Sequence, residues 1–363
     1  MPQQGTRSDG GGPRRQVNRV WRLARRPPAG WPSDGDFVLG DEAIPEPAAG
    51  QALTRTVYLS MDPYQWGRRR SGAEAVGDVC HGRTVSQVVR SRADEYQGGD
   101  FLFNTNGWQL YGLTGRNIDV FGYMFPRKLD PAVAPISTAV GVLGMLGLTA
   151  YSGIAVQCQP QPGETVVVSA ASGGVGQAAG QIAKLRGCRV VGIAGSKAKC
   201  DFVVEELGLD ACVSHRSRTY PDDLSAACPD GVDVYFENVG GHVFEGVLPL
   251  FNRNARISLC GMISQYGNTD GGDPGAVWAE TGRSVFDRQK VAVHRLFVRD
   301  FVAEHQDRFL DEMAGWIRDG AVKYREDIRE GLEQSPAAFS AMLAGGNFGK
   351  TLVSVSDDPT AAP

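Results

Sequence analysis

A run of β-branched residues leads directly into a glycine-rich turn near the middle of the chain. Residues 165–169 are Thr-Val-Val-Val-Ser, and an Ala-x-Gly-x-x-Gly pattern follows, with Ala171, Gly173 and Gly176 at its fixed positions. In this pattern the middle residue lets the backbone approach a pyrophosphate, and the last lets the following helix pack closely on the strand. The free N–H groups at the start of that helix favour phosphate. The spacing predicts a dinucleotide site, against the alternative of a purely structural turn.

The second strand of the same unit, residues 189–194, discriminates between the two nicotinamide dinucleotides. An NAD site usually has an acidic residue at the end of this strand, where it binds the ribose 2′-hydroxyl. Here a glycine and a serine follow, and then Lys197 and Lys199. A 2′-phosphate would meet hydroxyl and ammonium groups, and Arg216 and Arg218 could add positive charge. The sequence favours NADP(H), although an ordinary solvated helix start would also explain the lysines.

Metal ligands are sparse in the sequence. Cys80 and His81 are the only adjacent pair of typical ligands, whereas structural zinc needs four ligands at short spacings and catalytic zinc needs three. We therefore expect no metal site. Esterase chemistry has no support either, because no Gly-x-Ser-x-Gly motif occurs. Hydride transfer from a bound nicotinamide needs neither a metal nor a nucleophile, since the cofactor supplies the chemistry and the protein orients it.

The elements that must position these residues fall into two kinds. Before about residue 126, short runs broken by Gly, Pro and Asp predict a small β-rich barrel or sandwich, with strands at 54–60, 83–89 and 100–103. From residue 141 on, apolar strands alternate with helices. We expect strands at 165–169, 189–194, 211–214, 232–236, 255–260 and 291–296, helices at 174–187 and 197–207, and a last strand at 351–355. This alternation predicts an α/β fold with a doubly wound parallel sheet and helices on both faces.

Composition limits the other classes of function. The 363 residues carry 37 Lys and Arg against 41 Asp and Glu, so we expect no nucleic-acid partner and no anionic membrane surface. The seven scattered cysteines, without a secretory signal, favour a reduced cytoplasmic protein. Residues 131–163 carry no charge and could cross a bilayer, but their glycines, prolines and hydroxyl residues favour a buried helix. Residues 1–15 are expected to be a disordered tail.

Six longer segments are characteristic enough to compare with known families. They are Tyr58-Leu-Ser-Met-Asp-Pro-Tyr-Gln-Trp-Gly-Arg, Gly144-Met-Leu-Gly-Leu-Thr-Ala-Tyr, Val168-Ser-Ala-Ala-Ser-Gly-Gly-Val-Gly, Phe236-Glu-Asn-Val-Gly-Gly, Cys260-Gly-Met-Ile-Ser-Gln-Tyr and Asn347-Phe-Gly-Lys. They resemble the zinc-free medium-chain dehydrogenases/reductases, in the group that contains prostaglandin reductase, leukotriene B4 12-hydroxydehydrogenase, plant double-bond reductases and bacterial curcumin reductase. The resemblance covers residues 16–356.

The resemblance implies a domain division and an activity. We expect a GroES-like β-rich catalytic domain at 16–140, a Rossmann NADP-binding domain at 141–322, a C-terminal segment at 323–356 that returns to the catalytic domain, and a tail at 357–363. The implied activity is the NADPH-dependent reduction of a C=C bond conjugated to a carbonyl group, in enone or enal substrates. The implied assembly is a cytoplasmic homodimer.

The resemblance also assigns cofactor contacts. Lys199 stands where the family's lysine binds the 2′-phosphate, and His215 replaces the tyrosine that usually shares this task. Asn238 resembles an asparagine that contacts the cofactor, and Asn347 resembles its C-terminal contact. The full set of predicted cofactor-binding residues is Ala171, Gly173, Gly174, Val175, Gly176, Gly195, Ser196, Lys199, His215, Arg216, Asn238, Cys260, Gly261, Phe297 and Asn347.

Two tyrosines are the expected catalytic residues. Hydride addition to the β-carbon of an enone leaves negative charge on the carbonyl oxygen, which needs a positioned hydrogen-bond donor. Tyr266 follows the carboxyl end of the fifth strand, the sheet edge where α/β folds bind ligands, and the resemblance gives it this role. Tyr64 is a second candidate. Trp278 and Phe286 could form walls of the pocket, and the enolate carbon could take its proton from water.

Two other functions share this architecture. A quinone oxidoreductase would reduce a different conjugated acceptor in the same site, and the sequence separates this activity poorly from enone reduction. The other alternative is a protein that binds NADPH without turnover, as a structural protein or a sensor. Tyr266 beside an intact cofactor loop argues against this last alternative.

Overall fold

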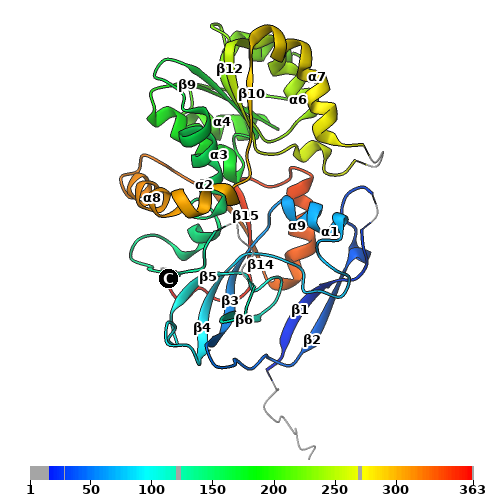
Figure 1. Cartoon of the computed structure of the whole chain (residues 1–363), viewed down its shortest axis with the longest axis vertical. Helices are drawn as coiled ribbons and strands as arrows, with labels where there is room; N and C mark the ends of the chain where they lie inside the picture. Colours follow the sequence, from blue (N-terminus) through cyan, green and yellow to red (C-terminus); the bar gives the residue numbers. More distant parts are fainter. Residues whose placement is uncertain (1–15, 28, 120–123, 269–271, 362–363) are drawn as a thin grey trace, which may run out of the picture.

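Two β-sheets organise the chain, and Figure 1 shows one above the other, with strand β15 near the middle. The structure is a computed structural model and describes residues 16–27, 29–119, 124–268 and 272–361. The predicted N-terminal tail, residues 1–15, lies outside the described residues, as do residues 362 and 363 of the predicted C-terminal tail. In the described part of that second tail, Asp358 accepts a hydrogen bond from the Tyr58 hydroxyl at 3.0 Å.

The upper sheet has six strands, and every neighbouring pair is parallel. The strands are β8 (Thr165–Ser169), β9 (Arg189–Ala194), β10 (Ala211–Ser214), β11 (Val232–Glu237), β12 (Phe251–Leu259) and β13 (Ala292–Arg295), in the order β10-β9-β8-β11-β12-β13. Valines dominate β8 and are fully buried, because helices cover both faces of the sheet. The chain winds outward in both directions from β8. In such sheets a ligand binds beyond the carboxyl ends of the strands at this point.

Helices connect these strands on both faces. They are α3 (Gly174–Leu185), α4 (Lys197–Glu205), α5 (Tyr220–Ala227), α6 (Gly241–Val247) and α7 (Pro274–Gln289). The first two begin at the predicted residues and each end two residues before the predicted ends. This part of the chain therefore confirms the predicted doubly wound parallel sheet.

The lower sheet is largely antiparallel and draws on both ends of the chain. Its strands are β3 (Gln51–Ser60), β4 (Thr84–Ser91), β5 (Phe101–Asn104), β6 (Tyr111–Gly115), β7 (Arg127–Leu129), β14 (Glu326–Glu330) and β15 (Lys350–Ser354). Strand β3 pairs with β4, β6 and β15, and β14 pairs with β15 in parallel. A separate antiparallel pair joins β1 (Asn18–Leu23) and β2 (Phe37–Glu42). Two helices border the space between the sheets, α1 (Tyr64–Ser71) and α9 (Ser335–Leu343).

The uncharged stretch at 131–163 forms three short helical segments. A 3₁₀ turn at Ile136–Val140 precedes α2 (Met145–Tyr151), which continues into a π-helical turn at Ser152–Cys158. Helix α2 packs against α3 and against α8 (Arg299–Arg318), where the Tyr151 and Phe309 rings meet at 5.8 Å. Among the described residues, no helix combines the length and the apolar character that a membrane span requires.

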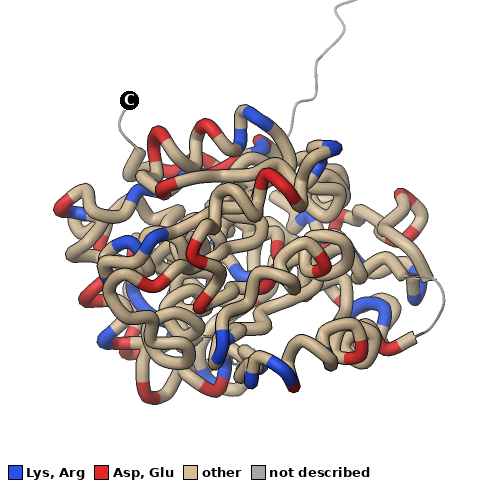
Figure 2. The backbone as a smooth tube through the Cα atoms, turned by 90° about the horizontal axis from the view of Figure 1, so that it is seen from above, with Lys and Arg blue, Asp and Glu red and all other residues tan. Residues whose placement is uncertain are grey.

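One apolar core continues from sheet to sheet. Val57 and Leu352 of the lower sheet belong to the same buried cluster as Val166 and Val168 of the upper sheet, and this cluster also contains Leu148 of α2. Charged residues of both signs are interspersed around the backbone in Figure 2. The shared core holds the two sheets together around the space in which the candidate site lies.

Candidate functional site

The glycine turn between β8 and α3 leaves the start of the helix open. Strand β8 ends at Ser169, and Ala170 then adopts a left-handed conformation, with φ +50°. Its carbonyl oxygen accepts a hydrogen bond from Gly173 N at 2.9 Å, which closes the turn. No side chain caps α3, so its first N–H groups face the cavity described next. A Cβ atom at Gly176 would collide with the Ala170 carbonyl, so the close approach of helix and strand requires glycine there.

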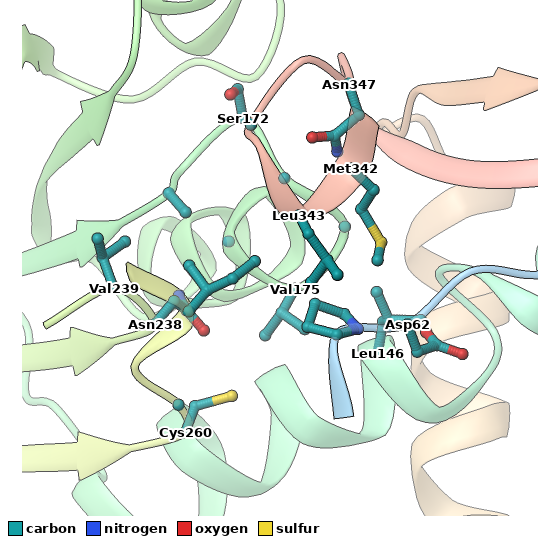
Figure 3. Close-up of a pocket in the computed structure, with 18 of the residues that line it drawn as sticks. Asp62, Leu146, Ser172, Val175, Asn238, Val239, Cys260, Met342, Leu343 and Asn347 are labelled. Atoms are coloured by element: carbon teal, nitrogen blue, oxygen red, sulfur yellow. The ribbon is translucent and has the colours of Figure 1, made fainter. Parts of the chain in front are cut away.

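A cavity of about 570 Å³ lies between the two sheets. Residues at and after the carboxyl ends of the parallel strands line one part of it. Figure 3 shows side chains from distant segments around it, with Asn238 and Cys260 on one side and Asn347 and Asp62 on others. The predicted site residues that line it are Tyr64, Gly173, Gly174, Val175, Gly176, Gly195, Lys199, His215, Arg216, Asn238, Cys260, Gly261, Tyr266, Phe297 and Asn347. This volume is typical of sites for small molecules and cofactors.

Two predicted cofactor-binding residues do not line the cavity. Ala171 is fully buried, and its N–H donates to the Ile193 carbonyl at 3.0 Å. This hydrogen bond holds the turn against strand β9. Ser196 caps α4 by accepting a hydrogen bond from Lys199 N at 3.3 Å. Both residues therefore support the local backbone, and their contact with a cofactor stays a prediction.

Cationic groups gather at one end of the cavity. A Cβ atom at Gly195 would lie 3.4 Å from His215 Nε2 and 3.8 Å from Arg216 Nε, so these side chains lie directly over the glycine. Lys199 Nζ donates to the Gly345 carbonyl at 2.9 Å. Burial, and then the charge of Arg216, lowers the pKa of Lys199. A phosphate dianion placed here would neutralise this crowded positive charge, which is the chemistry that a 2′-phosphate requires.

His215 differs from its cationic neighbours. Burial, and then the neighbouring His242, lowers the pKa of His215 to about 4. Its Nδ1 lies 3.2 Å from His242 Nε2. At neutral pH this imidazole is therefore uncharged and can offer a hydrogen bond or a ring face.

A buried carboxylate that the sequence analysis missed shapes the end of β11. Glu237 accepts hydrogen bonds from the N–H groups of Val239 and Gly240, at 2.7 and 3.1 Å, although burial raises the pKa of this carboxyl group. The next residue, Asn238, donates from its side chain to the Ser169 carbonyl at 2.7 Å. Glu237 thus fixes the loop that presents Asn238 to the cavity. An acid that ends an otherwise apolar strand just before Asn-Val-Gly-Gly was the available signal.

The prediction that Trp278 and Phe286 form walls of the cavity is wrong. Trp278 is buried against Phe244, with ring centroids 4.5 Å apart, and Phe286 lies in the same cluster, so neither ring lines the cavity. Both belong to α7, which packs on the outer part of the sheet. Trp31, from the loop between β1 and β2, lines the cavity instead. No local pattern indicated this contact, because it depends on how the two sheets meet.

Tyr266 lies on the loop that leaves β12. A Cβ atom at Gly261 would lie 2.8 Å from the Tyr266 hydroxyl oxygen, so a larger residue there would displace the phenol. The backbone carbonyl of Tyr266 accepts a hydrogen bond from Arg70 of α1. Helix α1 and the loop after β12 therefore both contribute to the position of this tyrosine in the cavity.

Tyr64, the first residue of α1, lines the same cavity beside a buried charge cluster. The guanidinium carbon of Arg83 lies 5.1 Å from the centre of the Tyr64 ring. Asp62 lies 3.8 Å from Arg83 and accepts a hydrogen bond from Lys350 Nζ at 2.9 Å. Burial alone raises the pKa of Asp62, but the charges of Lys350 and Arg83 outweigh it and hold that pKa below its usual value. The wall beside Tyr64 therefore carries fixed ions.

Cys80 and His81 lie beside α1. Burial raises the pKa of the Cys80 thiol to about 12, and the His81 ring contacts the Tyr64 hydroxyl. In the part of the chain that the structure describes, no group of three or more His, Cys, Asp or Glu residues could hold a metal ion.

The fold and the cavity together define a two-domain oxidoreductase whose parallel sheet presents a dinucleotide site to a β-rich partner domain. Family models agree: residues 19–117 match the N-terminal domain of oxidoreductase, and residues 174–295 match a model described as zinc-binding dehydrogenase. The chain belongs to the medium-chain dehydrogenase/reductase family, as the sequence segments predicted.

Individual relatives match along nearly the whole chain. The NADPH-dependent curcumin reductase of Escherichia coli is 41% identical, over 96% of this chain and 99% of that protein. Prostaglandin reductase 1 of Rattus norvegicus is 36% identical, over 92% of this chain and 98% of that protein. A crystal structure of CurA in complex with NADPH, from Vibrio vulnificus, has a TM-score of 0.85 and 39% identity, over 94% of this chain and all of that one.

Proposed function

We propose that the protein is an NADPH-dependent reductase of C=C bonds conjugated to a carbonyl group, in ketones and aldehydes. The observation that carries this proposal is the convergence in one cavity of the open start of α3, the cationic end at Lys199 and Arg216, and the phenols of Tyr64 and Tyr266. The relatives named as curcumin and prostaglandin reductases support the choice of an enone substrate.

The residues present fit NADPH. The N–H groups at the start of α3 would bind its pyrophosphate, and Lys199 with Arg216 would bind the 2′-phosphate. Asn238 and Asn347 would contact the remaining polar groups, together with the other cofactor-binding residues predicted above. When bound, NADPH would supply the hydride that reduces the β-carbon.

The protein's own contribution is to orient the substrate and stabilise charge. The Tyr266 hydroxyl would hydrogen-bond the carbonyl oxygen as negative charge develops on it, and Tyr64 would place a second phenol donor beside the reacting atoms. Apolar side chains such as Leu146, Met342 and Leu343 line the cavity and would exclude water from the reacting carbons. Hydrophobic enones are therefore the expected substrate class.

Purified protein tests this function directly. We expect NADPH to be consumed with unbranched trans-3-alken-2-ones and 2-alkenals, with the saturated carbonyl compound as product. Consumption with quinones alone would move the assignment to a quinone oxidoreductase. Consumption with no acceptor, while NADPH still binds, would indicate a binding protein without turnover.

The assembly and the metal requirement complete the proposal. We propose a cytoplasmic homodimer in which the edge of β13, the last strand of the parallel sheet among the described residues, is an available interface, since Val293 is exposed there; light scattering on a sizing column tests the stoichiometry. We also propose the domain division that the sequence predicted, with domains at 16–140 and 141–322 and a C-terminal segment at 323–356. We also propose that activity needs no metal, so that exhaustive chelation leaves it unchanged. One equivalent of tightly bound zinc per chain would overturn that point.

A further inference from the structure

A hydrogen bond links the cavity to a second hollow. The hydroxyl oxygen of Tyr64, which lines the cavity, lies 2.8 Å from Nε2 of His81. The two rings meet edge to face, with their centroids 5.8 Å apart. His81 also lines a hollow of about 410 Å³ that is distinct from the cavity. The imidazole therefore lies between the two spaces.

The second hollow is polar and reaches the surface. It is lined by Arg22, Asp78 and Asp119, among other residues, and both aspartates are exposed. Water in this hollow can approach the edge of the imidazole. Tyr64 and His81 thus form a short path from the second hollow to the cavity.

The surroundings of the pair suit proton transfer. Burial, followed by the charges of Arg83, Arg68 and Arg69, lowers the pKa of His81 to about 3. The ring is therefore neutral at physiological pH, so one of its nitrogens carries a hydrogen and the other can accept one. The Arg83 guanidinium beside the Tyr64 ring would stabilise negative charge on the phenol oxygen during transfer.

We propose that Tyr64 and His81 form a proton relay that delivers a solvent proton to the α-carbon of the reduced substrate, a step that rests on the proposed function. After hydride addition at the β-carbon, the enolate electron pair forms a C–H bond with the Tyr64 hydroxyl proton, and the O–H bond electrons remain on the phenol oxygen. That oxygen takes the proton of His81 Nε2, and Nδ1 takes a proton from water in the second hollow, which leaves hydroxide to be neutralised by the solvent. Proton exchange with solvent then returns the imidazole to its starting tautomer. The net reaction consumes one hydride and one solvent proton.

The relay makes a stereochemical prediction. Tyr64 is fixed at the start of α1, so its proton arrives at one face of the α-carbon, whereas mobile water could reach either face. Reduction of an unbranched trans-3-alken-2-one with NADPH dideuterated at C4, in D₂O, places one deuterium on each reacting carbon. The ratio of the two diastereomers, measured by NMR, then reports the face of protonation.

Two His81 variants and one control isolate the relay. His81→Gln can still hydrogen-bond the Tyr64 hydroxyl but cannot pass a proton on, and His81→Val removes both nitrogens. We expect the wild type to give at least about a tenfold excess of one diastereomer, and both variants to give nearly equal amounts. The control Tyr266→Phe should lower kcat and keep the wild-type ratio.

The possible outcomes are distinct. A wild-type excess that persists in both His81 variants, or a wild type that gives both diastereomers equally, would overturn the relay and leave the reductase assignment intact. If neither His81 variant folds, Tyr64→Phe decides, since retention of the wild-type ratio by that variant also overturns the relay. A wild type that reduces no enone would instead remove the proposed function and the relay together.

Discussion

The guanidinium group of Arg70 bridges two backbone carbonyls from the other half of the chain: Nη1 donates to the carbonyl of Tyr266 at 2.6 Å, and Nη2 to that of Asn268 at 2.9 Å. Arg70 lies in the last turn of α1, whereas Tyr266 follows β12 of the parallel sheet. The contact therefore ties the two halves of the molecule together at the candidate catalytic tyrosine.

Removing this bridge should impair turnover more than cofactor binding. We expect Arg70→Ala to lower kcat on the best enone by about ten- to a hundredfold, because small displacements of a catalytic group have effects of this size. The KM for NADPH should change little. The control is Arg26→Ala: Arg26 contacts the carbonyls of Arg70 and Ser71 at the exposed end of the same helix. An unchanged kcat in Arg70→Ala would show that the Tyr266 loop holds its position without the bridge.

Tyr266→Phe tests the oxyanion donor itself. The substitution removes one transition-state hydrogen bond and keeps the ring, so kcat should fall by about a hundred- to a thousandfold, with NADPH affinity little changed. If Tyr64 contacts the same oxygen, the double variant with Tyr64→Phe should lose less than the product of the two single losses. Full kcat in Tyr266→Phe would reduce this tyrosine to a wall of the cavity.

Two neighbouring lysines offer a matched test of cofactor choice. Lys199 lines the cavity, whereas the Lys197 side chain is 88% exposed and paired with Asp201. Lys199→Ala should raise the KM for NADPH by about ten- to a hundredfold, because a charge-assisted contact contributes about 1.5–3 kcal/mol. The KM for NADH should stay the same, and Lys197→Ala should change neither value. Equal losses for the two cofactors would assign Lys199 a structural role.

Removing either partner of the ion pair between Asp62 and Lys350 should destabilise the folded state, because the other charge would stay buried without a partner. Their side chains are 1% and 4% exposed. Asp62→Asn leaves the ammonium group buried without its carboxylate, so the free energy of unfolding in urea should fall by about 3–5 kcal/mol. The double variant with Lys350→Met should recover much of this loss. A double variant no more stable than Asp62→Asn would show that the aspartate acts through other contacts.

Acid should weaken the fold through His81. Its folded-state pKa is lowered to about 3 by burial and by the nearby arginines, whereas an unfolded histidine titrates at 6.5. The unfolded chain therefore takes up the proton first, and this contribution to stability is complete above about pH 6.5 and is lost as the pH falls toward 3. His215, whose pKa is about 4, acts in the same direction.

Urea titrations between pH 7 and pH 5 measure this effect. His81→Gln should lose less unfolding free energy over that range than the wild type, by up to about 1.4 kcal/mol per pH unit at the steepest point. Identical pH slopes in the two proteins would mean that His81 is protonated as easily in the folded state as in the unfolded one.

The nucleotide-binding half was predictable because its signals are local. Strands β8, β9 and β10 have the predicted bounds, since apolar runs between glycine turns define their ends. Helices α1, α5 to α8 and α9 were not predicted. Helix α7 buries only two residues, Trp278 and Gly282, so it shows little of the apolar periodicity that marks a helix in sequence.

The candidate site was predictable only in part for the same reason. The glycine turn and Lys199 belong to one continuous motif, but the partners of the tyrosines come from distant segments. Arg70 reaches Tyr266 across 196 positions, and Lys350 reaches Asp62 across 288. Such contacts depend on how β15 pairs with β3 and how the two sheets meet, which no local pattern contains.

The fate of the hydride tests the central claim most directly. NADPH dideuterated at C4 is incubated in ordinary water with the protein and a trans-3-alken-2-one, and the product is examined by NMR. The proposed function predicts a saturated ketone with one deuterium at the β-carbon. Deuterium at the carbonyl carbon of an allylic alcohol would contradict it, because the hydride would then have reduced the C=O bond.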